Sequence, residues 1–240
     1  MRIELIRPAA VVLAISGLAA AGPTFDEPPG GDAGTSREDA KDVKTDSGEG
    51  EVGVIRGSLT GTSALAGGYG DYQDVYRIYI ADPTVFRAET FGDINGTHPL
   101  SDPMLYLFNE AGQGIMANNN VHTQTGMSKL VNQDASGQQI FTEAGIYYLA
   151  ITSAPSEALA DIGGDLIPIF EMGLDGNDTG LVLPRADAAQ YPWVDWTFPN
   201  FENYGMYEIG LQGVESMPIP APAAMALLGV AAMGSRRRRS

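Results

Sequence analysis

The chain has 240 residues, of which 30 are acidic and 14 are basic, so its formal net charge is −16 at pH 7. An anionic surface of this kind repels nucleic acids and anionic lipids and favours solubility or divalent cations, so we exclude nucleic-acid binding. The absence of cysteine rules out disulfides and cysteine-ligated metal sites. The fold must therefore be stabilised by packing, with bound ions as a further source.

The first 21 residues have the layout of a secretory signal peptide. Arg2 and Arg7 form a positive start, an apolar run covers residues 9–18, and three alanines at 19–21 fit the small-residue cleavage pattern. We therefore expect export, with signal peptidase as a processing partner. A first core helix is the alternative, and the uninterrupted apolar run followed by polar sequence fits it less well.

Residues 22–51 are crowded with acids, Pro, Gly and Ser. Phe25 and Val43 are the only large apolar side chains in this segment. So few apolar groups cannot offset the entropy lost on ordering the chain. The composition predicts a disordered acidic linker.

Strand patterns begin at residue 52 and continue to residue 216. Short runs rich in β-branched and aromatic residues, separated by Gly, Asn, Asp or Pro, predict strands at 52–59, 74–80, 84–91, 103–110, 138–144, 145–153 and 204–213. Strict alternation places Tyr76, Ile78 and Ile80 on one face of their strand. The prediction is an all-β fold, an antiparallel β-sandwich of about seven to nine strands with jelly-roll or Greek-key connections.

Three motifs follow one another inside this region. They are GDYQDVYRIYI at 70–80, DPMLYLFNEAGQGIMANNN at 102–120 and EAGIYYLAIT at 143–152. Together with the last strand they resemble the bacterial pre-peptidase C-terminal domain, here spanning 52–216 with a poorly matched insert at 153–203. The resemblance implies a β-sandwich of the kind that accompanies secreted peptidases. That family often has adjacent aspartates after the hairpin, where this chain has asparagines at 118–120.

The tail at 217–240 combines prolines, an apolar run and four arginines. The sorting residues are Pro220, Pro222, Arg236, Arg237, Arg238 and Arg239. This arrangement resembles a PEP-CTERM sorting signal with Ala221 in place of the usual acidic residue. The resemblance implies processing by an exosortase and delivery to the cell surface or extracellular layer of a Gram-negative-type bacterium.

The apolar run at 221–234 is short for a permanent membrane anchor. As a helix it would reach about 20 Å, less than the hydrocarbon core of about 30 Å. We therefore expect transient membrane insertion of the tail, with the arginines on the cytoplasmic side. A plain C-terminal anchor is the alternative.

An aromatic stretch at 191–204 contains both tryptophans of the chain. Its candidate ligand-binding residues are Tyr191, Trp193, Asp195 and Trp196. Aromatic faces stack on sugar rings while a carboxylate holds hydroxyls, so extracellular polysaccharide is a candidate partner. The alternative, which these residue types favour, is packing in the core.

Acidic loops make calcium the candidate cofactor. The candidate ligands are Asp71, Asp74, Asp102, Asp175, Asn177 and Asp178. The last three begin like an EF-hand loop, but Ala186 stands where that loop needs a bidentate acid. The alternative is that these side chains form Asx-turns at loop corners.

Catalytic patterns are scarce in the chain. Its two histidines, His98 and His122, lie far apart, and it has no H-E-x-x-H, no G-x-S-x-G and no cysteine nucleophile. We predict an exported, non-enzymatic module of the cell surface or extracellular matrix that binds carbohydrate or Ca²⁺. The alternative is an accessory domain of an extracellular hydrolase, or such a hydrolase itself.

Overall fold

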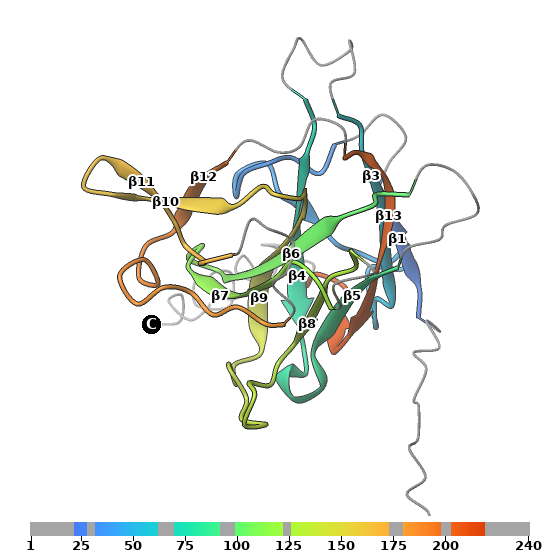
Figure 1. Cartoon of the computed structure of the whole chain (residues 1–240). Coiled ribbons are helices and arrows are strands. Elements are labelled where there is room, and N and C mark those ends of the chain that lie inside the picture. The colour runs from blue at the N-terminus through green and yellow to red at the C-terminus, as the bar shows by residue number, and fades with distance from the viewer. Residues whose placement is uncertain are drawn as a thin grey trace, which may run out of the picture.

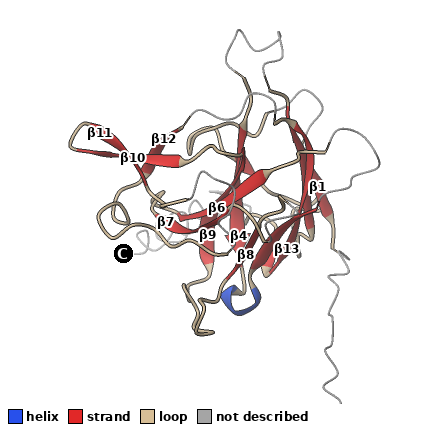
Figure 2. Ribbon diagram, viewed as in Figure 1, coloured by secondary structure: helices blue, strands red, loops and turns tan. Residues whose placement is uncertain are grey.

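The computed structural model describes seven segments of the chain. They are residues 22–27, 32–61, 70–91, 99–121, 126–172, 180–197 and 203–218. Apart from a 3-10 turn at Pro83–Val85, the regular elements of these segments are strands, as Figure 2 shows. The prediction of an all-β fold is confirmed. Within the described segments, no helix is long and apolar enough to cross a membrane.

Several predicted features lie outside the described residues. They are the signal peptide at 1–21, His98 and His122, the candidate ligands Asp175, Asn177 and Asp178, and the sorting residues Pro220, Pro222, Arg236, Arg237, Arg238 and Arg239. All of these remain predictions from the sequence.

The strands form three sheets (Figure 1). The first sheet has the order β1 (Thr24–Asp26), β3 (Val54–Leu59), β13 (Gly205–Gln212), β5 (Arg87–Phe91) and β8 (Lys129–Val131). The central sheet has the order β14 (Val214–Glu215), β4 (Gln73–Ile80), β9 (Gly145–Ser153), β6 (Pro103–Asn109) and β7 (Gly114–Asn118), with β2 (Lys41–Asp42) beside β4. The small sheet has the order β11 (Asp165–Pro168), β10 (Ala158–Ile162) and β12 (Trp193–Trp196).

The main core lies between the first sheet and the central sheet. Tyr76, Ile78 and Ile80 of β4 are buried in it, as the alternation predicted, and so are alternate residues of β13 from Tyr207 to Leu211. The long antiparallel pairings β4 with β9 and β9 with β6 form the centre of this sandwich.

The insert at 153–203 builds a third layer on the outer face of the central sheet. Tyr106 and Phe108 of β6 point into a second apolar cluster, which Phe170 and Trp193 close from the insert side. Because both faces of the central sheet are covered, β6 is a nearly continuous run of buried residues. In Figure 1 the small sheet lies beside the central sheet, on the side away from β1, β3 and β13.

The prediction of a disordered linker at 22–51 is wrong for the described residues of that segment. β1 runs parallel to β3, and β2 runs parallel to β4, so the segment adds edge strands to both main sheets. Ala33 and Val43 are fully buried, and Phe25 packs against the main core. The segment needs no core of its own, because the exposed edges of the sandwich supply both hydrogen-bond partners and apolar surface.

The prediction of a strand at 138–144 is also wrong, because these residues form a loop. The side chain of Asn132 takes the place of a partner strand: it accepts from the backbone N–H groups of Ile140 and Phe141 and donates to the carbonyl of Phe141. Phe141 still packs in the main core, which explains the apolar pattern. With the short edge strands and the insert, the described strands number fourteen, more than the sequence predicted.

Candidate metal centre

Four carboxylates gather where the N-terminal segment meets the end of the sandwich. Glu27 follows β1, and its backbone N–H continues the pairing with β3 by donating to the carbonyl of Arg56. Asp32 begins a turn in which it accepts from the N–H of Gly34, and the carbonyl of Gly34 in turn accepts from Val75 in β4. Asp71 and Asp74 come from the start of β4 and the residues before it. Backbone pairing therefore brings both parts of the chain to one place.

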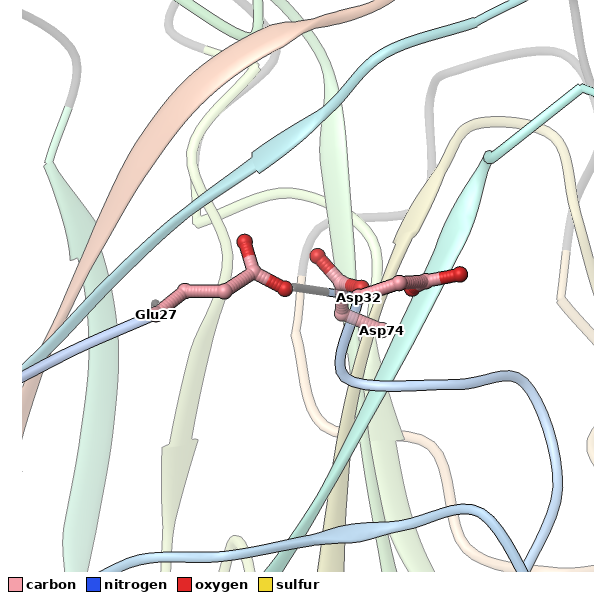
Figure 3. A group of neighbouring side chains, drawn as sticks. All are labelled: Glu27, Asp32 and Asp74. Atoms are coloured by element: carbon pink, nitrogen blue, oxygen red, sulfur yellow. The ribbon is translucent and has the colours of Figure 1, made fainter. Parts of the chain in front are cut away.

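Three of these side chains converge on a common point. Glu27, Asp32 and Asp74 each offer one carboxylate oxygen, and these atoms lie within 4.8 Å of one another. Figure 3 shows the carboxylate of Glu27 directed from the segment after β1 toward Asp32 and Asp74. Asp74 is fully buried, Glu27 is partly buried and Asp32 is exposed, so the group reaches from the interior to solvent.

Each buried carboxylate of the group has one oxygen with a partner. Glu27 Oε2 accepts from the N–H of Ser58 at 3.2 Å. Asp71 Oδ2 accepts from the N–H of Thr60 at 2.8 Å and from its hydroxyl at 3.1 Å. Asp74 Oδ2 accepts from the hydroxyl of Tyr207 at 2.5 Å. These bonds orient the carboxylates but engage only one oxygen of each.

The second oxygen of each is buried without a partner. Glu27 Oε1, Asp71 Oδ1 and Asp74 Oδ1 have no hydrogen-bond partner within the described part of the chain. Buried polar atoms are almost always paired, and an unpaired one costs roughly 1–3 kcal/mol. Three such atoms in one cluster leave acceptor capacity that a proton or a bound cation would satisfy.

The pKa values of three carboxylates in the group are raised. Burial raises the pKa of Glu27 to about 7 and that of Asp71 to about 6, and the neighbouring carboxylates add to both increases. Burial also raises the pKa of Asp74 well above its usual range, and the charges of Glu27, Asp71 and Asp32 raise it further. The folded protein therefore destabilises the ionised form of each carboxylate. A bound cation would stabilise that ionised form.

The donor set suits a hard cation. The ligands are carboxylate oxygens, and the chain has no cysteine to favour a soft metal. Ca²⁺ accepts six to eight oxygen ligands in flexible geometry, with water among them, whereas Mg²⁺ demands a tight octahedron. Carboxylates from two separate segments, with Asp32 at the solvent edge, fit the larger ion better.

The structure brings two of the candidate ligands together. Asp71 and Asp74 lie in one group, and their role as ligands stays a prediction. Asp102 is not a member: it precedes β6, two strands away from β4, and its backbone carbonyl accepts from Ala154 and Asn203. Glu27 and Asp32 were missed because they belong to the segment predicted as a linker. The one signal concerned Glu27, which stands two residues after Phe25, a large apolar residue near the start of that segment; no large apolar residue stands beside Asp32.

The aromatic stretch packs inside the protein. Trp193 is only 2% exposed, its ring stacks on Phe108 at 4.4 Å between centroids, and the guanidinium of Arg37 lies 5.8 Å from the ring centroid. Its faces are not available to a sugar, so the predicted stacking role of Trp193 is wrong and the packing alternative is correct.

The other three candidate ligand-binding residues, Tyr191, Asp195 and Trp196, do not form a sugar-binding surface in place of Trp193. Trp196 and Tyr191 are partly buried and pack against the second apolar cluster, and the indole N–H of Trp196 donates to the carbonyl of Thr35 at 2.8 Å. Asp195 is exposed. The four residues therefore form no open aromatic platform.

Comparison with known proteins returned no match, either to a protein-family model or to a curated protein.

Proposed function

We propose that this protein is an exported, non-catalytic β-sandwich module of a bacterial cell surface or extracellular layer, whose fold is completed by a calcium ion. The ion is held by Glu27, Asp32 and Asp74, with Asp71 beside them. The observation that carries the proposal is that carboxylate oxygens of Glu27, Asp32 and Asp74 converge, and that Glu27 and Asp74 each keep one buried oxygen without a donor among the described residues.

The proposed ion has a structural role, because its ligands come from two parts of the chain. Glu27 and Asp32 belong to the N-terminal segment, whereas Asp71 and Asp74 belong to the sandwich. The pairing of the segment with the main sheets is short, with three residues in β1 and two in β2. A shared cation would fasten the segment to the sandwich, and binding to the folded state alone would stabilise that state.

The setting of the protein supports this choice of ion. The signal-like N-terminus, the sorting-like tail and the resemblance to the pre-peptidase C-terminal domain all favour export. Extracellular calcium modules typically bind with dissociation constants of about 10⁻⁴ to 10⁻³ M. An ion taken up after export would complete the fold outside the cell, where no disulfide supports it.

Thermal unfolding of the intact chain tests the calcium part of the proposal. At a free Ca²⁺ concentration of about 100 times the dissociation constant, binding adds about 2.7 kcal/mol, which corresponds to a rise in Tm of roughly 5–10 °C for a chain of this size. We expect this rise relative to EGTA, and a smaller one with Mg²⁺. Equal Tm values in Ca²⁺ and EGTA would remove calcium from the proposal.

Mass spectrometry of the protein from native cells tests the export part. We expect loss of residues 1–21 and of the residues that follow the Pro220–Pro222 stretch. A full-length cytosolic species would contradict export.

A further inference from the structure

Two buried tyrosines from different sheets meet beside Asp74. Tyr76 lies in β4 and Tyr207 lies in β13, and their hydroxyl oxygens are 2.5 Å apart. The hydroxyl of Tyr207 also donates to Asp74 Oδ2. A phenol has one proton to donate, so the proton of Tyr207 goes to Asp74 and that of Tyr76 goes to Tyr207. The result is a directed chain of hydrogen bonds that ends on the carboxylate.

Gly57 provides the space for this arrangement. It lies in β3 directly opposite Tyr207. A Cβ atom at Gly57 would stand 2.3 Å from the hydroxyl oxygen of Tyr207 and 2.8 Å from that of Tyr76. Glycine weakens the interior of a strand and often marks a close approach. Here the close approach is made by the two hydroxyl groups.

Resting on the proposed calcium site, we infer that Tyr207 is a positioning residue for the cation. It holds Oδ2 of Asp74, which leaves Oδ1, buried and without a partner among the described residues, for the cation, while Tyr76 and Gly57 fix the position of Tyr207. The carboxylate torsion of aspartate is soft, so without this bond Asp74 would present either oxygen or neither. Since Tyr207 belongs to the first sheet and Asp74 to the central sheet, the bond also ties cation binding to the spacing of the two sheets.

Calorimetric titration of the intact chain with CaCl₂ tests this role. Hydrogen-bond partners of metal ligands typically contribute 10- to 100-fold to metal affinity, so we expect Tyr207→Phe to weaken Ca²⁺ binding by about that factor. The matched control is Tyr106→Phe, which removes the hydroxyl of another fully buried tyrosine, bonded to the carbonyl of Ser156 at 2.8 Å in the second cluster. The control should keep the wild-type affinity.

A second variant keeps the test decisive if Tyr207→Phe does not fold. Gly57→Ala retains every hydroxyl but forces those of Tyr76 and Tyr207 to move, so it should also weaken Ca²⁺ binding, again by about 10-fold or more. Both variants should shrink the Ca²⁺-induced rise in Tm, which a loss of packing alone would leave unchanged.

The outcomes separate this inference from the proposed function. If the wild-type chain binds no Ca²⁺, the proposed function fails and the positioning role fails with it. If the wild-type chain binds Ca²⁺ and Tyr207→Phe or Gly57→Ala binds it equally well, the site stands and the positioning role is wrong. An equal loss in Tyr106→Phe would also overturn the role, because it would mark a general effect of buried tyrosines.

Discussion

Glu27 and Asp74 present carboxylate oxygens to each other within 4.8 Å, although one follows an edge strand of the first sheet and the other lies buried in the central sheet. Two like charges at this distance repel each other, and burial increases the cost. The fold nevertheless holds them together with backbone hydrogen bonds on both sides. The calcium ion that we propose would relieve this repulsion.

Asp74→Asn should have opposite effects with and without calcium. Asparagine removes a buried charge and can still accept from Tyr207, so in EGTA we expect a Tm a few degrees above that of the wild-type chain. In saturating Ca²⁺ the Tm of the variant should not rise, so it should lie below the Tm of the wild-type chain. Thermal melts in the two buffers measure both effects.

Asp165→Asn is the control for that substitution, because Asp165 is exposed on β11. The Tm of this variant should equal that of the wild-type chain, both in Ca²⁺ and in EGTA. If Asp74→Asn keeps the full calcium-induced rise, Asp74 is not a ligand.

Stability without calcium should fall as the pH rises through the range in which the cluster titrates. The folded-state pKa of Glu27 is raised from 4.5 to about 7 and that of Asp71 from 3.8 to about 6. Below the unfolded values both states are protonated, so the groups contribute no difference. Between the unfolded and folded values the folded state binds more protons, so the free energy of unfolding decreases with increasing pH. Urea unfolding in EGTA from pH 4.5 to pH 8 measures the slope, and an increase over this range would contradict the assignment.

Calcium should protect the N-terminal segment against trypsin. Arg37, Lys41 and Lys44 lie in this segment, which the proposed ion fastens to the sandwich. Cleavage at these sites should slow in Ca²⁺ relative to EGTA, because local opening exposes them to the protease. Peptide mapping over time gives the rates, with cleavage after Lys129 of β8 as the internal reference. Identical rates at all sites in both buffers would show that the ion does not hold the segment.

Trp193→Ala should destabilise the protein rather than remove a binding activity. Trp193 is buried against Phe108 and Tyr148, and truncation of such a side chain costs about 3–5 kcal/mol. Val194 is 53% exposed, so Val194→Ala should change stability by less than about 0.5 kcal/mol. Urea unfolding measures the free energy of unfolding of both variants. A wild-type stability for Trp193→Ala would contradict the burial described above.

Side-chain alternation was sufficient to predict the sandwich. The buried face of β4 and that of β13 could be assigned because every second residue is apolar. The continuous apolar run that contains Tyr106 and Phe108 is typical of a strand covered on both faces, but nothing in that run identifies the insert as the segment that covers the second face.

No sequence pattern predicts that residues 22–51 pack against the two main sheets. β1 and β2 join the sheets through backbone hydrogen bonds, which any residue other than proline can make, and few of the described residues add apolar contacts: Phe25, Ala33, Ala40 and Val43. Two members of the carboxylate group, Glu27 and Asp32, could therefore not be recognised, since the sequence places them in a linker. Asp71 and Asp74 could be proposed as ligands because they lie at the start of a clear strand.

Anomalous diffraction from a crystal of the protein soaked in Tb³⁺, a calcium analogue with a strong signal, shows whether the carboxylate group binds a cation. We expect a peak between the carboxylates of Glu27, Asp32 and Asp74, which Ca²⁺ in excess displaces. A map with no peak at these side chains, at saturating Tb³⁺, would contradict this expectation.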